Sequence, residues 1–506
     1  MIAGTGSNVG KSQIVAGLCR LLARRGVSVA PFKAQNMALN SYVTPSGGEI
    51  GRAQAAQALA AGVEPEVTMN PVLLKPTSER TSQVIVMGKA IGHFDAASYH
   101  AMKQSLFGQV RNALADLRQR FDVVICEGAG SPAEINLLDS DIVNLRLAAE
   151  AGLASLIVGD IDRGGVFASL YGTVALLPES LRSGVRGFII NKLRGDPTLL
   201  GNGLEELELR TGIPTVAVLP YLHGLYMDGE DSLVLKDAFA WNRKQQAIEL
   251  PDGFLDVAVI NFPHISNFTD FDALFIEPEV HVRLVSHPAS LGMPDLLILP
   301  GTKSTVSDLG WLRDTGLDQV IHGLLSAPGN RTTLLGICGG YQILGKEIHD
   351  RVENGDGEVH VEGLGLLDVT TTFQAEKVVR QRKGLALGKS IEGYEIHHGI
   401  VRPLVSLEPF AVLHDRYGSG GEGIAVHERA IYGTNLHGLF DQDDFRRCFL
   451  AEVASRRGRS FRGGSTSFAE ERIGQADVMA DLLDSQLDFA LLERIITEAE
   501  RMGERV

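Results

Sequence analysis

Short apolar runs alternate with longer amphipathic stretches along most of the chain, and polar residues follow directly where the apolar runs end. The runs at 121–126, 154–160 and 185–190 are almost continuously apolar, which is typical of parallel strands buried on both faces. The stretch Gln13–Arg25 has the period of a helix. This alternation predicts an α/β fold with parallel sheets, in which the polar residues that follow the strands gather at one edge.

The alternation is interrupted once, which predicts two domains. Residues 236–252 are charged and lack a clear period, so we interpret them as a linker between a first α/β domain at 1–235 and a second at 253–447. Residues 358–372 alternate enough to predict antiparallel strands. The segment 448–506 carries an apolar helical stripe, which we expect to pack on the second domain. A chain of 506 residues is long enough for two or three domains.

A glycine-rich loop begins at Gly4 with the sequence Gly-Thr-Gly-Ser-Asn-Val-Gly-Lys-Ser and leads into the helix Gln13–Arg25. The backbone N–H groups of such a loop bind phosphate oxygens, the lysine adds positive charge, and the serine hydroxyl suits Mg²⁺. A glycine-rich turn without a nucleotide is the alternative, but the Gly-Lys-Ser ending favours ATP. The residues predicted to bind ATP are Thr5, Gly6, Ser7, Asn8, Val9, Gly10, Lys11 and Ser12.

Only Met1, Ile2 and Ala3 precede this loop. A central strand usually has about 5–6 residues. Either the strand is truncated or the coding sequence begins upstream of Met1, and we expect the second.

Polar residues after neighbouring strands predict the rest of this site. Glu127 follows the apolar run 121–126, where a carboxylate meets a metal-bound phosphate, and the predicted Mg²⁺ ligands are Ser12, Glu49 and Glu127. A second polar run follows the strand at 27–32, and the loop after 154–160 contains Asp-Arg-Gly-Gly. For that loop, a surface salt bridge between Asp162 and Arg163 is an equal alternative. The predicted substrate contacts are Lys33, Gln35, Asn36, Asp162 and Arg163.

Cys338 lies between a predicted strand and a predicted helix, in the sequence Gly-Ile-Cys-Gly-Gly. This is the thiol form of the strand–turn–helix motif that exposes a nucleophile, and its glycines allow the tight turn. The N-terminus of a helix also favours the thiolate. A buried cysteine in a glycine-rich turn is the alternative, and the flanking pattern favours the nucleophile.

A nucleophilic thiolate needs a base, and His437 is the best candidate of 14 histidines because it follows the strand at 430–432 among glycines. Glu395 and His398 lie near another predicted strand. Each either orients the base or touches the substrate, and a plain strand without a catalytic role is equally probable for this segment.

Two local resemblances follow from these motifs. The phosphate loop, one residue longer than the usual form, resembles that of dethiobiotin synthetase, which implies that Asn191 faces the adenine. The Cys338 and His437 segments resemble the class I (triad) glutamine amidotransferases, which release ammonia from glutamine through a thioester. That resemblance implies an oxyanion hole with N–H groups near Gly301 and Gly339. Most of these enzymes carry Glu two residues after the histidine, where Leu439 stands here, so the third triad member is unassigned.

Motifs along the whole chain resemble the cobyric acid synthase family: Gly-Ser-Asn-Val-Gly-Lys-Ser, Pro-Phe-Lys-Ala-Gln-Asn-Met, Asp-Ile-Asp-Arg-Gly-Gly, Asn-Lys-Leu-Arg-Gly-Asp and Ile-Cys-Gly-Gly-Tyr-Gln. The resemblance implies ATP- and glutamine-dependent amidation of the b, d, e and g carboxylates of adenosylcobyrinic acid a,c-diamide, through acyl phosphates. Cobyrinic acid a,c-diamide synthase is the first alternative, but it carries Lys-x-Gly-Pro-Asp-Tyr at the second motif. A phosphate-loop switch protein with a relic glutaminase is the other; partitioning ATPases carry a lysine where Gly6 stands.

Charge and composition restrict the partners. The net charge is −15, which argues against a nucleic-acid partner. The four cysteines, at 19, 126, 338 and 448, form neither a disulfide framework nor a close-spaced metal motif. No apolar run has the length of a membrane span, and no signal peptide is present, so we expect a cytoplasmic protein.

Overall fold

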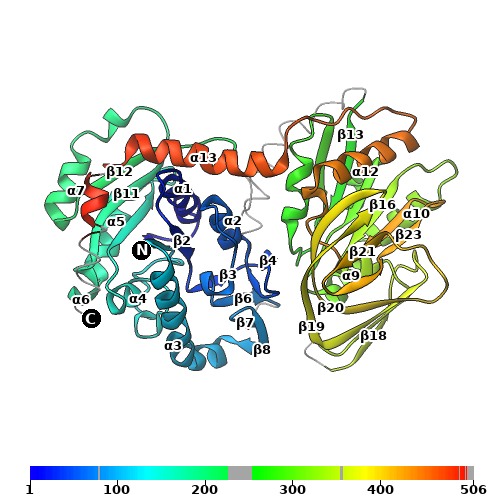
Figure 1. The fold of residues 1–506 in the computed structure, drawn as a ribbon, viewed down its shortest axis with the longest axis horizontal. Helices are drawn as coiled ribbons and strands as arrows, with labels where there is room; N and C mark the ends of the chain where they lie inside the picture. The colour runs from blue at the N-terminus through cyan, green and yellow to red at the C-terminus, as the bar shows by residue number, and fades with distance from the viewer. Residues whose placement is uncertain (78–79, 226–252, 354–356, 489, 496, 498–506) are drawn as a thin grey trace.

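The computed structural model describes residues 1–77, 80–225, 253–353, 357–488, 490–495 and 497, which form two α/β domains side by side (Figure 1). The predicted linker at 236–252 lies outside the described residues. The long red helix α13 (Phe468–Gln486) runs from the second domain back across the first.

The first domain is built on parallel strands, as the apolar runs predict. One sheet has the order β1-β10-β11-β12, and β2 pairs with β9, whose end is bridged to β1 through Ile2 and Glu127. Apolar side chains of these strands are buried beneath the helices. The strands are β1 (Ile2–Gly4), β2 (Val29–Phe32), β9 (Val123–Cys126), β10 (Ser155–Asp160), β11 (Val185–Leu193) and β12 (Thr215–Pro220); the helices are α1 (Lys11–Arg24), α2 (Arg52–Ala60), α3 (Ala96–Arg120), α4 (Leu145–Glu150), α5 (Val166–Leu176), α6 (Glu179–Arg182) and α7 (Gly203–Thr211).

Smaller sheets extend the first domain toward the second. A sheet of order β3-β6-β7-β8 and the hairpin β4-β5 lie on the side that faces the second domain (Figure 1). The polar run predicted after β2 is therefore partly strand, and its end lies in the domain interface. These strands are β3 (Gln35–Met37), β4 (Ser41–Val43), β5 (Glu49–Gly51), β6 (Val72–Pro76), β7 (Thr81–Val86) and β8 (Lys89–Asp95).

The second domain contains a sheet of order β14-β13-β15-β16-β24-β23, which is parallel except at β23, and a separate, mainly antiparallel sheet. The antiparallel strands predicted at 358–372 correspond to β18 and the start of β19. The main strands are β13 (Leu255–Ile260), β14 (Val280–Val285), β15 (Leu296–Leu299), β16 (Thr333–Ile337), β23 (Ile424–Val426) and β24 (Ile431–Thr434); the others are β17 (Glu347–Asp350), β18 (Val359–Glu362), β19 (Val369–Ala386), β20 (Lys389–Pro403), β21 (Ala411–Asp415) and β22 (Gly418–Glu422); the helices are α9 (Thr305–Asp314), α10 (Leu317–Ser326), α11 (Gly339–Ile343) and α12 (Asp443–Arg456).

The C-terminal segment differs from the prediction. Helix α12 packs into the core of the second domain, but α13 packs against α1 of the first. Gly17 of α1 permits this contact, because a Cβ there would lie 2.3 Å from Met479 Cγ. Asp477 of α13 forms an ion pair with Arg20 at 2.7 Å. The apolar stripe was recognisable in the sequence, but its partner depends on contacts between the two ends of the chain.

No helix in the described ranges is both long and apolar enough to span a bilayer.

We expect Leu483→Ala to lower the free energy of unfolding by about 2–5 kcal/mol, because it removes a fully buried side chain from the α1–α13 contact. The control is Leu209→Ala on α7, where the side chain is 81% exposed and the change should be nearly neutral. Urea unfolding of both variants provides the measurement. Equal stability of the two variants would contradict the packing of α13 on α1.

Candidate active sites

The glycine-rich loop joins β1 to α1 in a form suited to phosphate. Asn8 and Gly10 have φ of 61° and 100°, and a Cβ on Gly10 would lie 2.2 Å from Asn191 Nδ2. Lys11 Nζ donates to the Gly6 carbonyl at 2.8 Å, which closes the loop. A cavity of about 1440 Å³ borders the loop at Ser7, Asn8, Gly10, Lys11 and Ser12, whereas Thr5, Gly6 and Val9 do not line it.

Asn191 lies beside this loop and helps to fix its shape. Its Nδ2 donates to the Val9 carbonyl at 2.9 Å, and its Oδ1 accepts from the Lys192 N–H at 2.9 Å. Asn191 also borders the cavity. Both ends of the side-chain amide therefore bind backbone in this structure, and contact with adenine remains a prediction.

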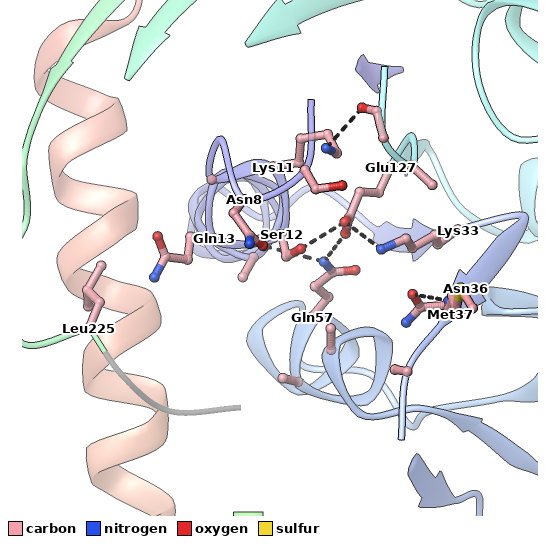
Figure 2. A pocket seen from close by; sticks show the side chains of 18 of the residues that line it. Asn8, Lys11, Ser12, Gln13, Lys33, Asn36, Met37, Gln57, Glu127 and Leu225 are labelled. Carbon is pink, nitrogen blue, oxygen red and sulfur yellow. Dashed lines mark hydrogen bonds and ion pairs between the residues drawn. The ribbon is translucent and has the colours of Figure 1, made fainter. Parts of the chain in front are cut away.

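Glu127 is the centre of a buried polar cluster at the loop (Figure 2). It accepts hydrogen bonds from Ser12 Oγ at 2.8 Å, Lys33 Nζ at 2.9 Å and Gln57 Nε2 at 2.6 Å. The Ser12 hydroxyl and the Glu127 carboxylate are the hard oxygen ligands that Mg²⁺ prefers. Their proximity at the cavity wall fits such an ion. Gln57 was not predicted, although it lies on α2, the helix that follows the polar run after β2.

The predicted substrate residues separate into two groups. Lys33, Gln35, Asn36 and Arg163 line the cavity. Asp162 instead forms an ion pair with Arg194 at 2.5 Å on the surface, whereas the alternative considered for this loop was a salt bridge between Asp162 and Arg163. The opposite wall includes Ile265, Phe268 and Phe275 of the second domain together with part of α13. Both domains thus enclose the cavity.

Cys338 lies at the turn between β16 and α11, as the motif predicts. Its φ of 51° and ψ of −111° are strained for a residue with a side chain. A Cβ on Gly336 would lie 2.7 Å from the Tyr341 Cα, and one on Gly340 would lie 2.0 Å from the Leu299 carbonyl. The two glycines therefore permit a turn that places the thiol at the start of a helix.

His437 is buried and is held by a carboxylate that was not predicted from the sequence. Its Nδ1 lies 2.7 Å from Asp270 Oδ2, and Asp270 Oδ1 accepts from the Gly438 N–H at 2.9 Å. Burial lowers the pKa of His437, but Asp270 and Cys338 outweigh it and raise the pKa to about 10. Cys338, His437 and Asp270 are thus arranged in the order of a Cys–His–Asp triad, and Asp270 comes from the 3₁₀ turn Phe268–Leu274 rather than from the position of Leu439. Its only signal was a polar run after β13.

The predicted oxyanion-hole residues lie near each other. A Cβ on Gly339 would lie 3.0 Å from the Thr302 nitrogen, and one on Gly301 would lie 2.9 Å from His437 Cε1. The loop after β15 therefore contacts both the turn that carries Cys338 and the base. Their N–H groups as donors to an oxyanion remain a prediction.

Glu49 does not lie at the phosphate loop, so its prediction as a Mg²⁺ ligand is wrong. It is buried in the domain interface, 3.0 Å from Lys75 Nζ and 2.5 Å from Lys377 Nζ. Burial favours the neutral acid, but these two lysines outweigh it and hold the pKa of Glu49 well below its usual range.

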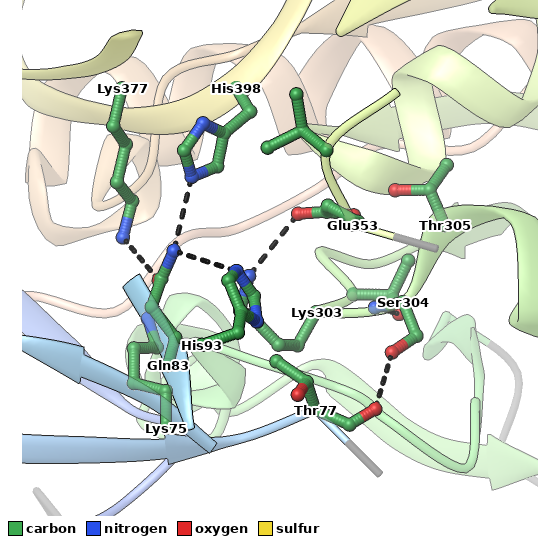
Figure 3. Close-up of polar contacts among 12 residues, drawn as sticks. Lys75, Thr77, Gln83, His93, Lys303, Ser304, Thr305, Glu353, Lys377 and His398 are labelled. Atoms are coloured by element: carbon green, nitrogen blue, oxygen red, sulfur yellow. Dashed lines mark hydrogen bonds and ion pairs between the residues drawn. The ribbon is translucent and has the colours of Figure 1, made fainter. Parts of the chain in front are cut away.

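Further polar groups from both domains lie near Lys75 and Lys377 (Figure 3). His398 Nε2 lies 3.1 Å from Gln83 Nε2, and burial together with Lys303 and Lys377 lowers the pKa of His398 to about 3. Glu395 binds Arg382 at 2.9 Å. Neither His398 nor Glu395 therefore orients His437. A pocket of about 30 Å³ here is lined by Lys75 of the first domain and Cys338 of the second.

Comparison with known proteins matches both domains. Residues 1–233 match the family model of the CobQ/CobB/MinD/ParA nucleotide binding domain, and residues 256–445 match that of the CobB/CobQ-like glutamine amidotransferase domain.

The match to curated relatives covers nearly the whole chain. The cobyric acid synthase of Nocardia farcinica is 49% identical over 99% of this chain and 97% of its own length. That of Streptomyces avermitilis is also 49% identical, over 99% and 97%, and that of Saccharopolyspora erythraea is 50% identical over 98% and 94%. With its two domains in the same order, the chain belongs to the cobyric acid synthase family.

Proposed function

We propose that the protein amidates the b, d, e and g carboxylates of adenosylcobyrinic acid a,c-diamide, using ATP and glutamine, to form adenosylcobyric acid. The observation that carries this proposal is the presence of two sites in one molecule. One is the Cys338–His437–Asp270 arrangement of a glutaminase, and the other is the phosphate-loop cavity that both domains enclose. Membership of the cobyric acid synthase family supports the corrinoid as substrate. We call the first domain the synthetase domain and the second the glutaminase domain.

In the glutaminase domain, the Cys338 thiolate attacks the carboxamide carbon of glutamine, and the N–H groups of Gly301 and Gly339 stabilise the oxyanion. His437 gives its proton to the departing nitrogen, so that ammonia leaves and a thioester forms. Water then attacks the thioester, His437 accepts its proton, and glutamate is released. Asp270 keeps the imidazole oriented and stabilises its charged form.

In the synthetase domain, a corrinoid carboxylate attacks the γ-phosphate of ATP and forms an acyl phosphate and ADP. Lys11 and the loop N–H groups stabilise the charge of the transferring phosphoryl group, and Mg²⁺ held by Ser12 and Glu127 would neutralise further charge. Ammonia then attacks the acyl carbon and phosphate leaves. Lys33, Gln35, Asn36 and Arg163 would contact the substrate, and their position in the lining of the cavity supports this role.

The product distinguishes this proposal from cobyrinic acid a,c-diamide synthase. Incubation with adenosylcobyrinic acid a,c-diamide, ATP and glutamine should add amides stepwise until adenosylcobyric acid accumulates, as followed by chromatography and mass spectrometry. Amidation confined to the a and c carboxylates of a less amidated corrinoid would favour the diamide synthase instead. A protein that hydrolyses ATP but not glutamine would fit the switch protein.

We expect Cys338→Ser to abolish glutamine-dependent amidation while amidation with concentrated ammonium salt continues. A serine hydroxyl is almost fully protonated near neutral pH, and this site is arranged for a thiolate. Amide formed per minute with each nitrogen source is the measurement. Wild-type activity with glutamine would exclude Cys338 as the nucleophile.

Lys11→Ala should reduce amidation by roughly 100-fold or more with either nitrogen source, because it removes a charge that stabilises phosphoryl transfer. The same assay, with glutamine and with ammonia in parallel, compares it with Cys338→Ser. A variant that lost only the glutamine-dependent reaction would show that Lys11 does not serve the ATP site.

Asp270→Asn should lower kcat for glutamine hydrolysis by about 10²–10⁴-fold, because an amide neither stabilises the imidazolium nor selects its tautomer. The shape of the side chain is preserved, so amidation with ammonia should be retained. Glutamate release and ammonia-dependent amidation are measured on the same preparation. An unchanged rate of glutamate release would remove Asp270 from the catalytic triad.

A further inference from the structure

One short segment of the synthetase domain contacts both active sites. Residues 35–39 line the synthetase cavity. The next two residues, Asn40 and Ser41, are fully buried and hydrogen-bond to the glutaminase domain. A single stretch of backbone therefore leads from the proposed substrate wall into the other domain.

Asn40 and Asn267, one from each domain, form a reciprocal pair of hydrogen bonds where this segment meets the glutaminase domain; we call this pair the clasp. Asn40 Oδ1 accepts from the Phe268 N–H at 3.1 Å, and Asn267 Oδ1 accepts from the Ser41 N–H at 3.0 Å. Asn267 has φ of 52° and ψ of 40°, a left-handed conformation that asparagine tolerates better than most residues. Each side chain thus satisfies a buried backbone donor of the other domain, and the clasp fixes the two backbones relative to each other.

The clasp leads to His437 through Asp270. The Asp270 N–H donates to the Asn267 carbonyl at 3.0 Å, so the carboxylate that holds His437 lies on the turn that Asn267 begins. Asn40 binds Phe268, the next residue of the same turn, so the turn that carries Asp270 is anchored to the synthetase domain.

A second connection runs from Ser41 through Tyr394. The Tyr394 hydroxyl donates to the Ser41 carbonyl at 3.2 Å. Its ring stacks on the His437 ring with centroids 5.4 Å apart, and the two residues exchange backbone hydrogen bonds at 2.9 and 3.1 Å. Ser41 is therefore held at its N–H by the turn that carries Asp270 and at its carbonyl by the ring that packs on the base.

We propose that Asn40 and Ser41 of the synthetase domain are positioning residues of the glutaminase, and that occupancy of the cavity along residues 35–39 sets the geometry of His437. This inference rests on the proposed function, since it needs both reactions. A ligand that binds more tightly to one conformation of residues 35–39 shifts the protein toward that conformation, and His437 toward the geometry that goes with it. Glutamine is then hydrolysed fastest when ATP and the corrinoid are bound, which limits wasteful release of ammonia.

The test uses variants of the two connections in the full-length protein. Asn40→Ala removes the acceptor for the Phe268 N–H, and Asn40→Asp retains it as the conservative control. Tyr394→Phe removes only the hydroxyl that binds Ser41 and keeps the ring on His437. Glutamate release is measured with and without ATP plus adenosylcobyrinic acid a,c-diamide, and amidation is measured with ammonium chloride.

In the wild type, ATP and the corrinoid should raise kcat for glutamine hydrolysis by about fivefold or more, the usual range of coupling between sites. Asn40→Ala and Tyr394→Phe should each lose most of this stimulation and about fivefold in stimulated kcat, the effect of one lost buried hydrogen bond. KM for glutamine and ammonia-dependent amidation should stay at wild-type values, and Asn40→Asp should restore the stimulation.

Two results would overturn the inference: a wild-type hydrolysis rate that is the same with and without ATP and corrinoid, or full stimulation in both Asn40→Ala and Tyr394→Phe. Because Tyr394→Phe removes a single oxygen, it keeps the test valid if Asn40→Ala fails to fold. Failure of the proposed function gives a different result, since the wild type would then form no amide from the corrinoid with either nitrogen source.

Discussion

The pairing of buried charges between the two domains is the constraint on which their arrangement depends. Glu49 of the synthetase domain lies between Lys75 of its own domain and Lys377 of the glutaminase domain, and all three side chains are almost fully buried. A buried carboxylate that loses its partner costs several kcal/mol, so orientations that separate Glu49 from Lys377 are strongly disfavoured. Burial lowers the pKa of Lys377 to about 8, which Glu49 partly opposes. This docking brings Asn40 and Ser41 to the glutaminase.

The same docking closes the synthetase cavity with segments that are distant in sequence. The phosphate loop forms one side, Ile265 and Phe268 of the glutaminase domain form another, and α13 covers a third. The neighbours Ser266 and Asn267 line the small pocket that contains Cys338. The turn at 265–268 therefore lies between the two cavities, with Ile265 and Phe268 on one and Ser266 and Asn267 on the other.

Features with a local code could be predicted from the sequence. The phosphate loop, Cys338 and His437 lie directly after strands, and the strands are apolar because both of their faces are buried. Asp270, Glu49 and α13 depend instead on partners far away in the chain: Asp270 binds a residue 167 positions later, and Lys377 lies 328 positions after Glu49. Leu439 stands where most class I amidotransferases carry glutamate, and the carboxylate that contacts His437 comes instead from another loop, as Asp270. No local pattern encodes such pairings.

The supports of His437 explain why contact with the synthetase domain matters. On one side its own domain fixes the backbone: Glu422 binds the Thr434 hydroxyl and the Asn435 N–H, both at 2.7 Å, and the Thr434 carbonyl accepts from the Cys338 N–H. This side ties the base rigidly to the nucleophile. The remaining supports are Asp270 on the ring nitrogen and Tyr394 on the ring face, and both connect to Ser41, through Asn267 in one case and directly in the other. Among the described contacts of the imidazole, those of Asp270 and Tyr394 therefore link it to the synthetase domain.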